Sequence, residues 1–226
     1  MQGEIQMTDE KPYIITISRE LGSGGAYLGQ RLASRLGIAY ADREIVRRAA
    51  ESFDLPEDVV EPLDEKVTPF WLSLLRTFEY GSPEYCCIRK LPLVPSDTEF
   101  HDEECRIVED IAQKRSAVIV GRGGFFLLRD NPRHLSVFLF ADKEFRVKRI
   151  KDAYDLSVEK AEELIEVSDR DRRKCRRELT RSEGVDARLF HLCLDTGALG
   201  LECAEEIIVM GLLARIGASP AEQSKS

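Results

Sequence analysis

The sequence lacks the features of membrane proteins, secreted proteins and zinc-binding proteins. It has no run of about 18 apolar residues, which excludes a transmembrane helix. Its first ten residues are polar, so they predict a loose tail and not a signal peptide. Its six cysteines form no C-x-x-C pair and no cysteine–histidine spacing typical of a zinc site. We therefore expect a cytoplasmic protein with free thiols.

The few cysteine and histidine residues that could carry chemistry have simpler interpretations. Cys193 lies in an apolar run and Cys203 lies near the start of a helical pattern, so both are predicted to be small buried hydrophobes. The adjacent Cys86 and Cys87 leave a redox pair as an open alternative. His101 is followed by acidic residues, which more often form the solvated first turn of a helix than a metal site. No metal ligand is predicted.

Positive charge is also scarce, and it is unevenly placed. The chain has 33 Lys+Arg against 41 Asp+Glu, a formal net charge of −8, which argues against non-specific binding to nucleic acid. Residues 51–110 hold 16 acidic and 5 basic residues, a local charge of −11. Residues 170–181 hold seven basic and two acidic residues, a local charge of +5. A concentrated cationic segment on an acidic chain indicates a specific anionic ligand.

Short apolar runs bounded by turn residues predict five strands that alternate with helices. The strands are expected at 13–18, 38–41, 116–120, 134–140 and 188–194. Helical patterns cover 26–36, a segment after Asp42, 142–154, 157–181 and a closing segment from 201. Apolar strands that alternate with helices form a parallel sheet covered on both faces, so the predicted fold class is α/β.

Two stretches interrupt this alternation. One is acidic and predicts helices that begin at Leu55 and Phe70, followed by a long loop over residues 80–99. The other is the helical, arginine-rich stretch 157–181.

A glycine-rich turn joins the first strand to the first helix. The stretch reads Arg19-Glu-Leu-Gly-Ser-Gly-Gly25, and the helix follows from Ala26. Glycines let the backbone approach an anion closely, and a helix N-terminus adds free N–H groups and a positive dipole end. We therefore predict a phosphate cradle made by Gly22, Ser23, Gly24 and Gly25. A tight turn without a ligand is the alternative.

This turn departs from the Walker A pattern G-x-x-x-x-G-K-S/T. Gly25 stands at the lysine position, and Ala26 or Tyr27 stands near the position of the Ser/Thr that binds magnesium.

Several segments together resemble the cytidylate kinase-like family, a branch of the P-loop nucleoside monophosphate kinases. The segments are Ile17–Gly25, Tyr40–Ile45, Val118–Gly123, Val137–Arg149, Asp169–Arg172 and Leu192–Thr196. The similarity runs from about residue 12 to 215, and residues 66–99 match poorly. The resemblance implies a three-layer P-loop NTPase fold for residues 12–226 after a flexible tail at 1–11, with an acceptor-binding insert near 54–113 and a lid near 151–185.

The resemblance also implies an activity: phosphoryl transfer from ATP, with Mg²⁺, to a nucleoside monophosphate, with CMP or dCMP as the first expectation. The expected partner is a small nucleotide, with no nucleic acid and no membrane, and the oligomeric state is left open. A kinase of another small acceptor and a nucleotide-sensing protein without transfer remain alternatives. In more typical cytidylate kinases an aspartate follows the Gly-Arg turn, where this chain has Gly123, and Cys175-Arg176 replaces an aromatic pair in the lid.

Phosphoryl transfer requires positive charge around the transferred group, so arginines are the expected catalytic residues. These are Arg19, Arg149, Arg170 and Arg172. The resemblance also implies that Arg122 grips the acceptor phosphate and that Asp42 positions the acceptor nucleoside. The alternatives are structural: ion pairs for Arg19 and Arg122, a helix cap for Asp42, and a solvated charged face for the lid arginines.

Overall fold

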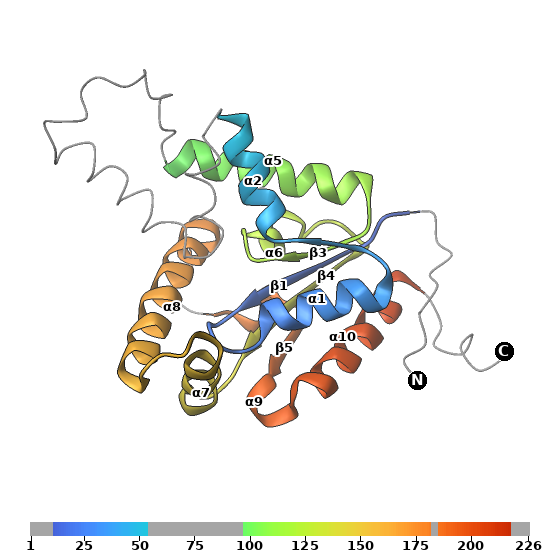
Figure 1. Ribbon diagram of the computed structural model, residues 1–226. Helices are drawn as coiled ribbons and strands as arrows, with labels where there is room; N and C mark the ends of the chain where they lie inside the picture. The colour runs from blue at the N-terminus through green and yellow to red at the C-terminus, as the bar shows by residue number, and fades with distance from the viewer. Residues whose placement is uncertain (1–10, 54–96, 182–184, 218–226) are drawn as a thin grey trace, which may run out of the picture. The chain divides into compact units, whose positions relative to one another are not determined.

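The computed structural model describes residues 11–53, 97–181 and 185–217 (Figure 1). The chain divides into two compact units. The larger contains the chain up to Ala41 and from Val108 onward, and the smaller runs from Asp42 to Ile107. The predicted tail lies outside the described residues except for Lys11, as do the helices expected at Leu55 and Phe70 and most of the loop expected over 80–99.

The larger unit is built on a five-stranded sheet in which every pair of neighbours is parallel, which confirms the predicted α/β class. The strands are β1 (Ile14–Arg19), β2 (Ala39–Ala41), β3 (Ala117–Val120), β4 (His134–Phe140) and β5 (Leu192–Asp195). Their order is β2-β3-β1-β4-β5, so β1 is central. The carboxyl ends of all five strands therefore meet at one edge of the sheet.

The fifth strand begins later than predicted, at Leu192 and not at Arg188. The residues before it form a 3₁₀ turn, η2 (Ala187–Leu189), because the Asp186 carboxylate accepts the backbone N–H of Arg188 at 3.0 Å. A local side-chain bond of this kind competes with pairing to the sheet.

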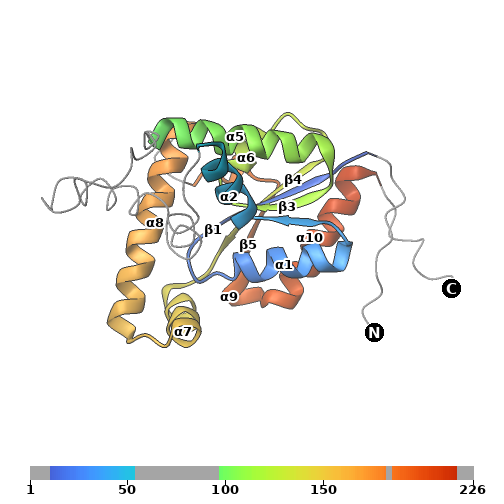
Figure 2. The same ribbon diagram turned by 45° about the horizontal axis from the view of Figure 1, so that its top comes forward.

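Two helices cover one face of this sheet, α1 (Gly25–Leu36) and α10 (Leu201–Ile216), and they lie side by side in Figures 1 and 2. The predicted leucine stripe of α1 is buried against the isoleucines and valines of β1 and β3. That burial is why the i, i+4 pattern forms a helix here. On the other face α6 (Gly124–Leu127) packs against β1.

Helices α7 (Lys143–Tyr154) and α8 (Val158–Thr180) form an antiparallel pair at one end of the larger unit (Figure 1). Their shared core consists of Val147, Ile150, Ala161 and Ile165. A short helix, α9 (Thr196–Leu199), links β5 to α10. None of the helices in the described ranges is long and apolar enough to cross a membrane.

The smaller unit contains α2 (Arg43–Ser52) and most of α5 (Asp97–Lys114). The rings of Phe53 and Phe100 stack with centroids 6.1 Å apart, and the Ser52 hydroxyl donates to Glu103 at 3.0 Å. Asp42 directly precedes α2.

The prediction that Cys193 and Cys203 are buried is wrong, because both are exposed. Side chains alternate along a strand, and the inward positions of the edge strand β5 are taken by Leu192 and Leu194. Cys193 therefore faces the other side. On α10 the buried position belongs to Ala204, which leaves Cys203 on the solvent side.

Candidate functional site

Two turns lie next to each other at the carboxyl edge of the sheet. The glycine turn, Gly22–Gly25, follows β1, and the arginine turn, Gly121–Gly124, follows β3. These two strands are paired through Ile17 and Val120, and the Gly121 N–H donates to the Ile17 carbonyl at 2.9 Å. Parallel α/β sheets bind ligands at this edge, so the predicted phosphate cradle has a suitable position.

The backbone of the glycine turn requires glycine at two positions. Gly22 and Gly24 both have φ of +87°, in the left-handed region. A Cβ on Gly22 would lie 2.8 Å from the Arg146 carbonyl oxygen, and a Cβ on Gly24 would lie 2.6 Å from Leu201 Cδ2. Helix α1 then begins without a side-chain cap, so its first-turn N–H groups have no partner within the helix. Such a helix start can bind an anion through its backbone.

The side chain of Ser23 supports the turn from inside. It is fully buried, and its hydroxyl donates to the carbonyls of Glu20 at 2.8 Å and Leu139 at 3.3 Å. The Ser23 carbonyl accepts the Thr196 hydroxyl at 2.8 Å. The Ser23 N–H donates to the Glu20 carbonyl at a longer 3.4 Å, so both the side chain and the backbone of Ser23 hold the turn together.

The side chain of Arg19 packs against Gly25, the position at which a Walker A loop has its lysine. A Cβ built on Gly25 would lie 2.8 Å from Arg19 Cγ and 3.0 Å from Arg19 Cβ, so the stem of the arginine fills that space. A Cβ on Gly121 would overlap Arg19 Nη1. The stem of Arg19 therefore lies against the glycine turn, and its guanidinium lies against Gly121 of the arginine turn.

The arginine turn has an unusual left-handed backbone. Arg122 has φ of +53° between Gly121 at +80° and Gly123 at +65°. A non-glycine residue held there costs of order 1–3 kcal/mol, and such strain is concentrated at functional sites. A Cβ on Gly123 would lie 2.8 Å from Leu179 Cδ1, so α8 occupies the place that an aspartate would need.

A charged cluster joins the glycine turn to α7 and α8. Arg146 Nη1 lies 2.5 Å from Asp169 Oδ2, and its Nε lies 3.5 Å from Glu20. Asp169 Oδ1 lies 3.7 Å from Arg172 Nη1, so the structure brings one predicted lid arginine close to the turn. Burial raises the pKa of Glu20, and the positive charge of Arg146 opposes that rise. Burial also lowers the pKa of Arg176, whose guanidinium lies 5.5 Å from the Phe138 ring centroid.

The structure shows other surroundings for two more predicted site residues of the larger unit. The Arg149 guanidinium lies over the Phe145 ring of its own helix, 5.7 Å from the centroid, and Arg170 is exposed on α8. Asp42 belongs to the smaller unit. The catalytic roles of Arg149 and Arg170 and the acceptor role of Asp42 stay predictions.

The sequence did not assign a role to Arg146 or Asp169. Asp169 stands in the Asp169–Arg172 segment, but its hydrogen bond to Leu21 joins residues 148 positions apart. No sequence spacing indicates a contact over that separation.

Within the described ranges, no group of three or more His, Cys, Asp or Glu side chains could hold a metal ion. Mg²⁺ in phosphoryl-transfer sites takes much of its coordination from substrate phosphates and water.

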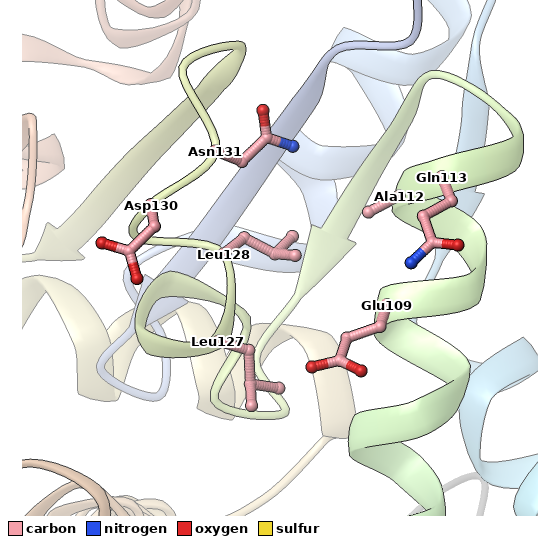
Figure 3. Close-up of a pocket in the computed structure, with 7 residues that line it drawn as sticks. All are labelled: Glu109, Ala112, Gln113, Leu127, Leu128, Asp130 and Asn131. Atoms are coloured by element: carbon pink, nitrogen blue, oxygen red, sulfur yellow. The ribbon is translucent and has the colours of Figure 1, made fainter.

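A separate hollow of about 360 Å³ lies between α5 and the loop after α6 (Figure 3). Its polar lining comes from Glu109, Gln113, Asp130 and Asn131, and none of the predicted site residues borders it. Two carboxylates would repel a phosphate, so the candidate site is the glycine turn and not this hollow.

Comparison with known proteins gives a family and a fold. A model of the cytidylate kinase-like family matches residues 14–198. An uncharacterized protein from Eubacterium ventriosum ATCC 27560 is 21% identical, with a TM-score of 0.63 over 88% of this chain and 98% of that one. A gluconokinase from Sinorhizobium meliloti 1021 is 16% identical, with a TM-score of 0.52 over 96% and 100%. No curated protein matches significantly.

Proposed function

The chain belongs to the cytidylate kinase-like family, and from that premise we propose that it transfers a phosphoryl group from ATP to a nucleoside monophosphate, CMP or dCMP first. The observation that carries the proposal is the position of Arg19. Its stem fills the space of the missing lysine side chain above Gly25, and its guanidinium lies against Gly121 of the arginine turn. A loop without the usual lysine therefore retains a cation beside the place where donor phosphates would bind.

The proposed mechanism is positioning combined with electrostatic stabilisation. The backbone N–H groups of Gly22–Gly25 bind the donor phosphates, and Arg19 supplies positive charge beside them. Arg122 holds the acceptor phosphate, a task that suits a bidentate guanidinium. Arg172, with Arg149 and Arg170, neutralises charge when the lid near 151–185 closes and excludes water.

Mg²⁺ bound to ATP would neutralise charge on the phosphates. No general base is needed on the protein, because the phosphate of the acceptor is already ionised at neutral pH. In this proposal Asp42 and the insert near 54–113 position the acceptor nucleoside. A cytoplasmic location accords with the four described cysteines, none of which forms a disulfide.

A second candidate is a protein that binds nucleotide without transferring phosphate. Two observations favour it: Ala26 stands where a hydroxyl would bind magnesium, and Leu179 fills the space beside Gly123 where an aspartate would stand. Both changes remove groups needed for transfer and leave the phosphate cradle intact.

The test incubates the protein with ATP, Mg²⁺ and a panel of nucleoside monophosphates and other small acceptors, and measures phosphorylated products. The expected result is CDP or dCDP. ATP binding by calorimetry with no diphosphate from any monophosphate would rule out the nucleotide kinase. A product from a different acceptor would identify a kinase of another class.

A further inference from the structure

Leu21, which immediately precedes the glycine turn, is held at both of its backbone polar groups. Its N–H donates to Asp169 Oδ1 at 2.9 Å, and its carbonyl accepts from Arg146 Nη1 at a longer 3.4 Å. Its side chain packs against the shared core of α7 and α8. The segment that enters the turn is therefore fixed by two helices that follow it by more than a hundred residues.

The two side chains that hold Leu21 also bind each other. Arg146 Nη1 and Asp169 Oδ2 are 2.5 Å apart, and each side chain is 11% exposed. Breaking such a buried pair by removing one partner leaves an uncompensated charge and is strongly destabilising. The turn also sits directly on α7, because a Cβ on Gly22 would lie 2.9 Å from Arg146 Cβ.

Each oxygen of Asp169 has a separate function in this arrangement. Oδ1 accepts the Leu21 N–H and lies 3.7 Å from Arg172 Nη1, while Oδ2 pairs with Arg146. An ionised acceptor strengthens a hydrogen bond from a backbone N–H. One carboxylate on α8 thus fixes the turn, an arginine of α7 and a predicted lid arginine.

We infer that Asp169 is a positioning residue, which with Arg146 clamps Leu21 and so fixes the backbone of the glycine turn before a ligand binds. Such preorganisation increases affinity because less conformational freedom is lost on binding. The consequence for ATP rests on the proposed function. The clamp itself does not rest on the proposed function, since it is a property of the unliganded protein.

The first test measures hydrogen exchange of the Leu21 amide by NMR in unliganded Asp169→Ala and Asp169→Asn. Exchange is expected to accelerate at least tenfold in Asp169→Ala relative to a core amide such as that of Ile17 on β1, and less in Asp169→Asn, whose amide oxygen can still accept. The matched control is Glu166→Gln, an exposed carboxylate three residues earlier on α8, 3.8 Å from Lys143. Unchanged Leu21 exchange in folded Asp169→Ala would overturn the clamp. Equal acceleration of exchange at Leu21 and at Ile17 would indicate a merely structural role for Asp169 and would overturn it as well.

The second test measures ATP affinity by calorimetry, and Asp169→Ala is expected to bind about tenfold more weakly, a loss of about 1.4 kcal/mol. Faster Leu21 exchange with unchanged ATP affinity would refute the positioning role. If the wild-type protein does not bind ATP, the proposed function fails, while the exchange result still decides the clamp. If Asp169→Ala does not fold, the double variant Asp169→Asn/Arg146→Gln is used in its place. It is expected to recover stability that Asp169→Asn alone loses, and no recovery would contradict the pairing of Asp169 with Arg146.

Discussion

Exchanging residues 19 and 25 tests whether Arg19 replaces the lysine of a standard nucleotide-binding loop. The double variant Arg19→Gly/Gly25→Lys creates the spacing G-x-x-x-x-G-K over residues 19–25. Glycine at position 19 is required, because a Cβ on residue 25 would still lie 3.0 Å from the Cβ of any other side chain there. The two positions are therefore expected to depend on each other.

The structure gives the size of each effect. Arg19→Gly removes a cation beside the phosphates, and loss of one such group costs about 10²–10³ in kcat, roughly 3–4 kcal/mol. Gly25→Lys alone forces a Cβ within 2.8 Å of Arg19 Cγ, and overpacking of this kind costs about 1–3 kcal/mol of stability. In the double variant the lysine stem enters the vacated space, so stability returns and at least tenfold of the lost nucleotide affinity is expected to return.

The assay is kcat and ATP affinity by calorimetry, together with urea unfolding of all four proteins. Arg188→Gln is the matched control, because Arg188 is 89% exposed and pairs with Asp186 on η2. Wild-type ATP affinity in folded Arg19→Gly would refute the role of the arginine. A double variant no better than Arg19→Gly would refute the claim that the two side chains share one space.

Three further predictions concern the larger unit. Burial lowers the pKa of His134 from 6.5 to about 4, so the unfolded chain binds a proton between pH 6.5 and 4 that the folded chain does not bind, and the free energy of unfolding should fall by roughly 3 kcal/mol over this range. Urea unfolding should show a smaller fall in His134→Gln, and an equal fall would contradict the assignment to His134. Gly123→Asp should lower Tm because position 123 has φ of +65° and its Cβ would lie 2.8 Å from Leu179 Cδ1, and the loss should be smaller in a Leu179→Ala background; a Tm equal to wild type would show that both the turn and the Leu179 side chain adjust. Glu205→Gln, at a buried carboxylate, should cost about 1–3 kcal/mol, whereas its exposed neighbour Glu206→Gln should stay within about 0.5 kcal/mol; equal losses in urea unfolding would refute the burial argument.

The sheet was predictable because its signals are local. The β-branched run Ile14–Ile17 is buried on both faces, and the leucines of α1 recur every four residues. The start of the fifth strand was not predictable from apolar content, because one hydrogen bond from the Arg188 N–H to Asp186 decides it.

The two turns of the candidate site could be placed on the fold from the sequence, but their contacts could not. The glycines after β1 mark the carboxyl edge, and the structure puts the arginine turn beside them. What the sequence could not reveal are contacts between distant segments: Leu21 with Asp169, and Gly123 with Leu179. The inward orientation of Ser23 was equally hidden, since a serine in a glycine turn has the same spacing whether its hydroxyl faces a ligand or the sheet.

The glycines at positions 25 and 123 are departures from common kinase patterns, and the residues around them give these two departures different consequences. At Gly25 the missing side chain is replaced by another cation in the same space, because Arg19 lies there. At Gly123 the missing carboxylate is replaced by an apolar side chain, because Leu179 lies there. Asp169, the carboxylate beside the glycine turn, already holds Leu21 and Arg146, so it does not make up for the loss. Nucleotide affinity should therefore be close to that of a lysine-containing loop, and any deficit should appear in the rate of transfer. Measuring Kd for ATP and kcat separately distinguishes the two: weak binding would contradict the compensation by Arg19, and a fast transfer would show that no carboxylate is needed beside Arg122.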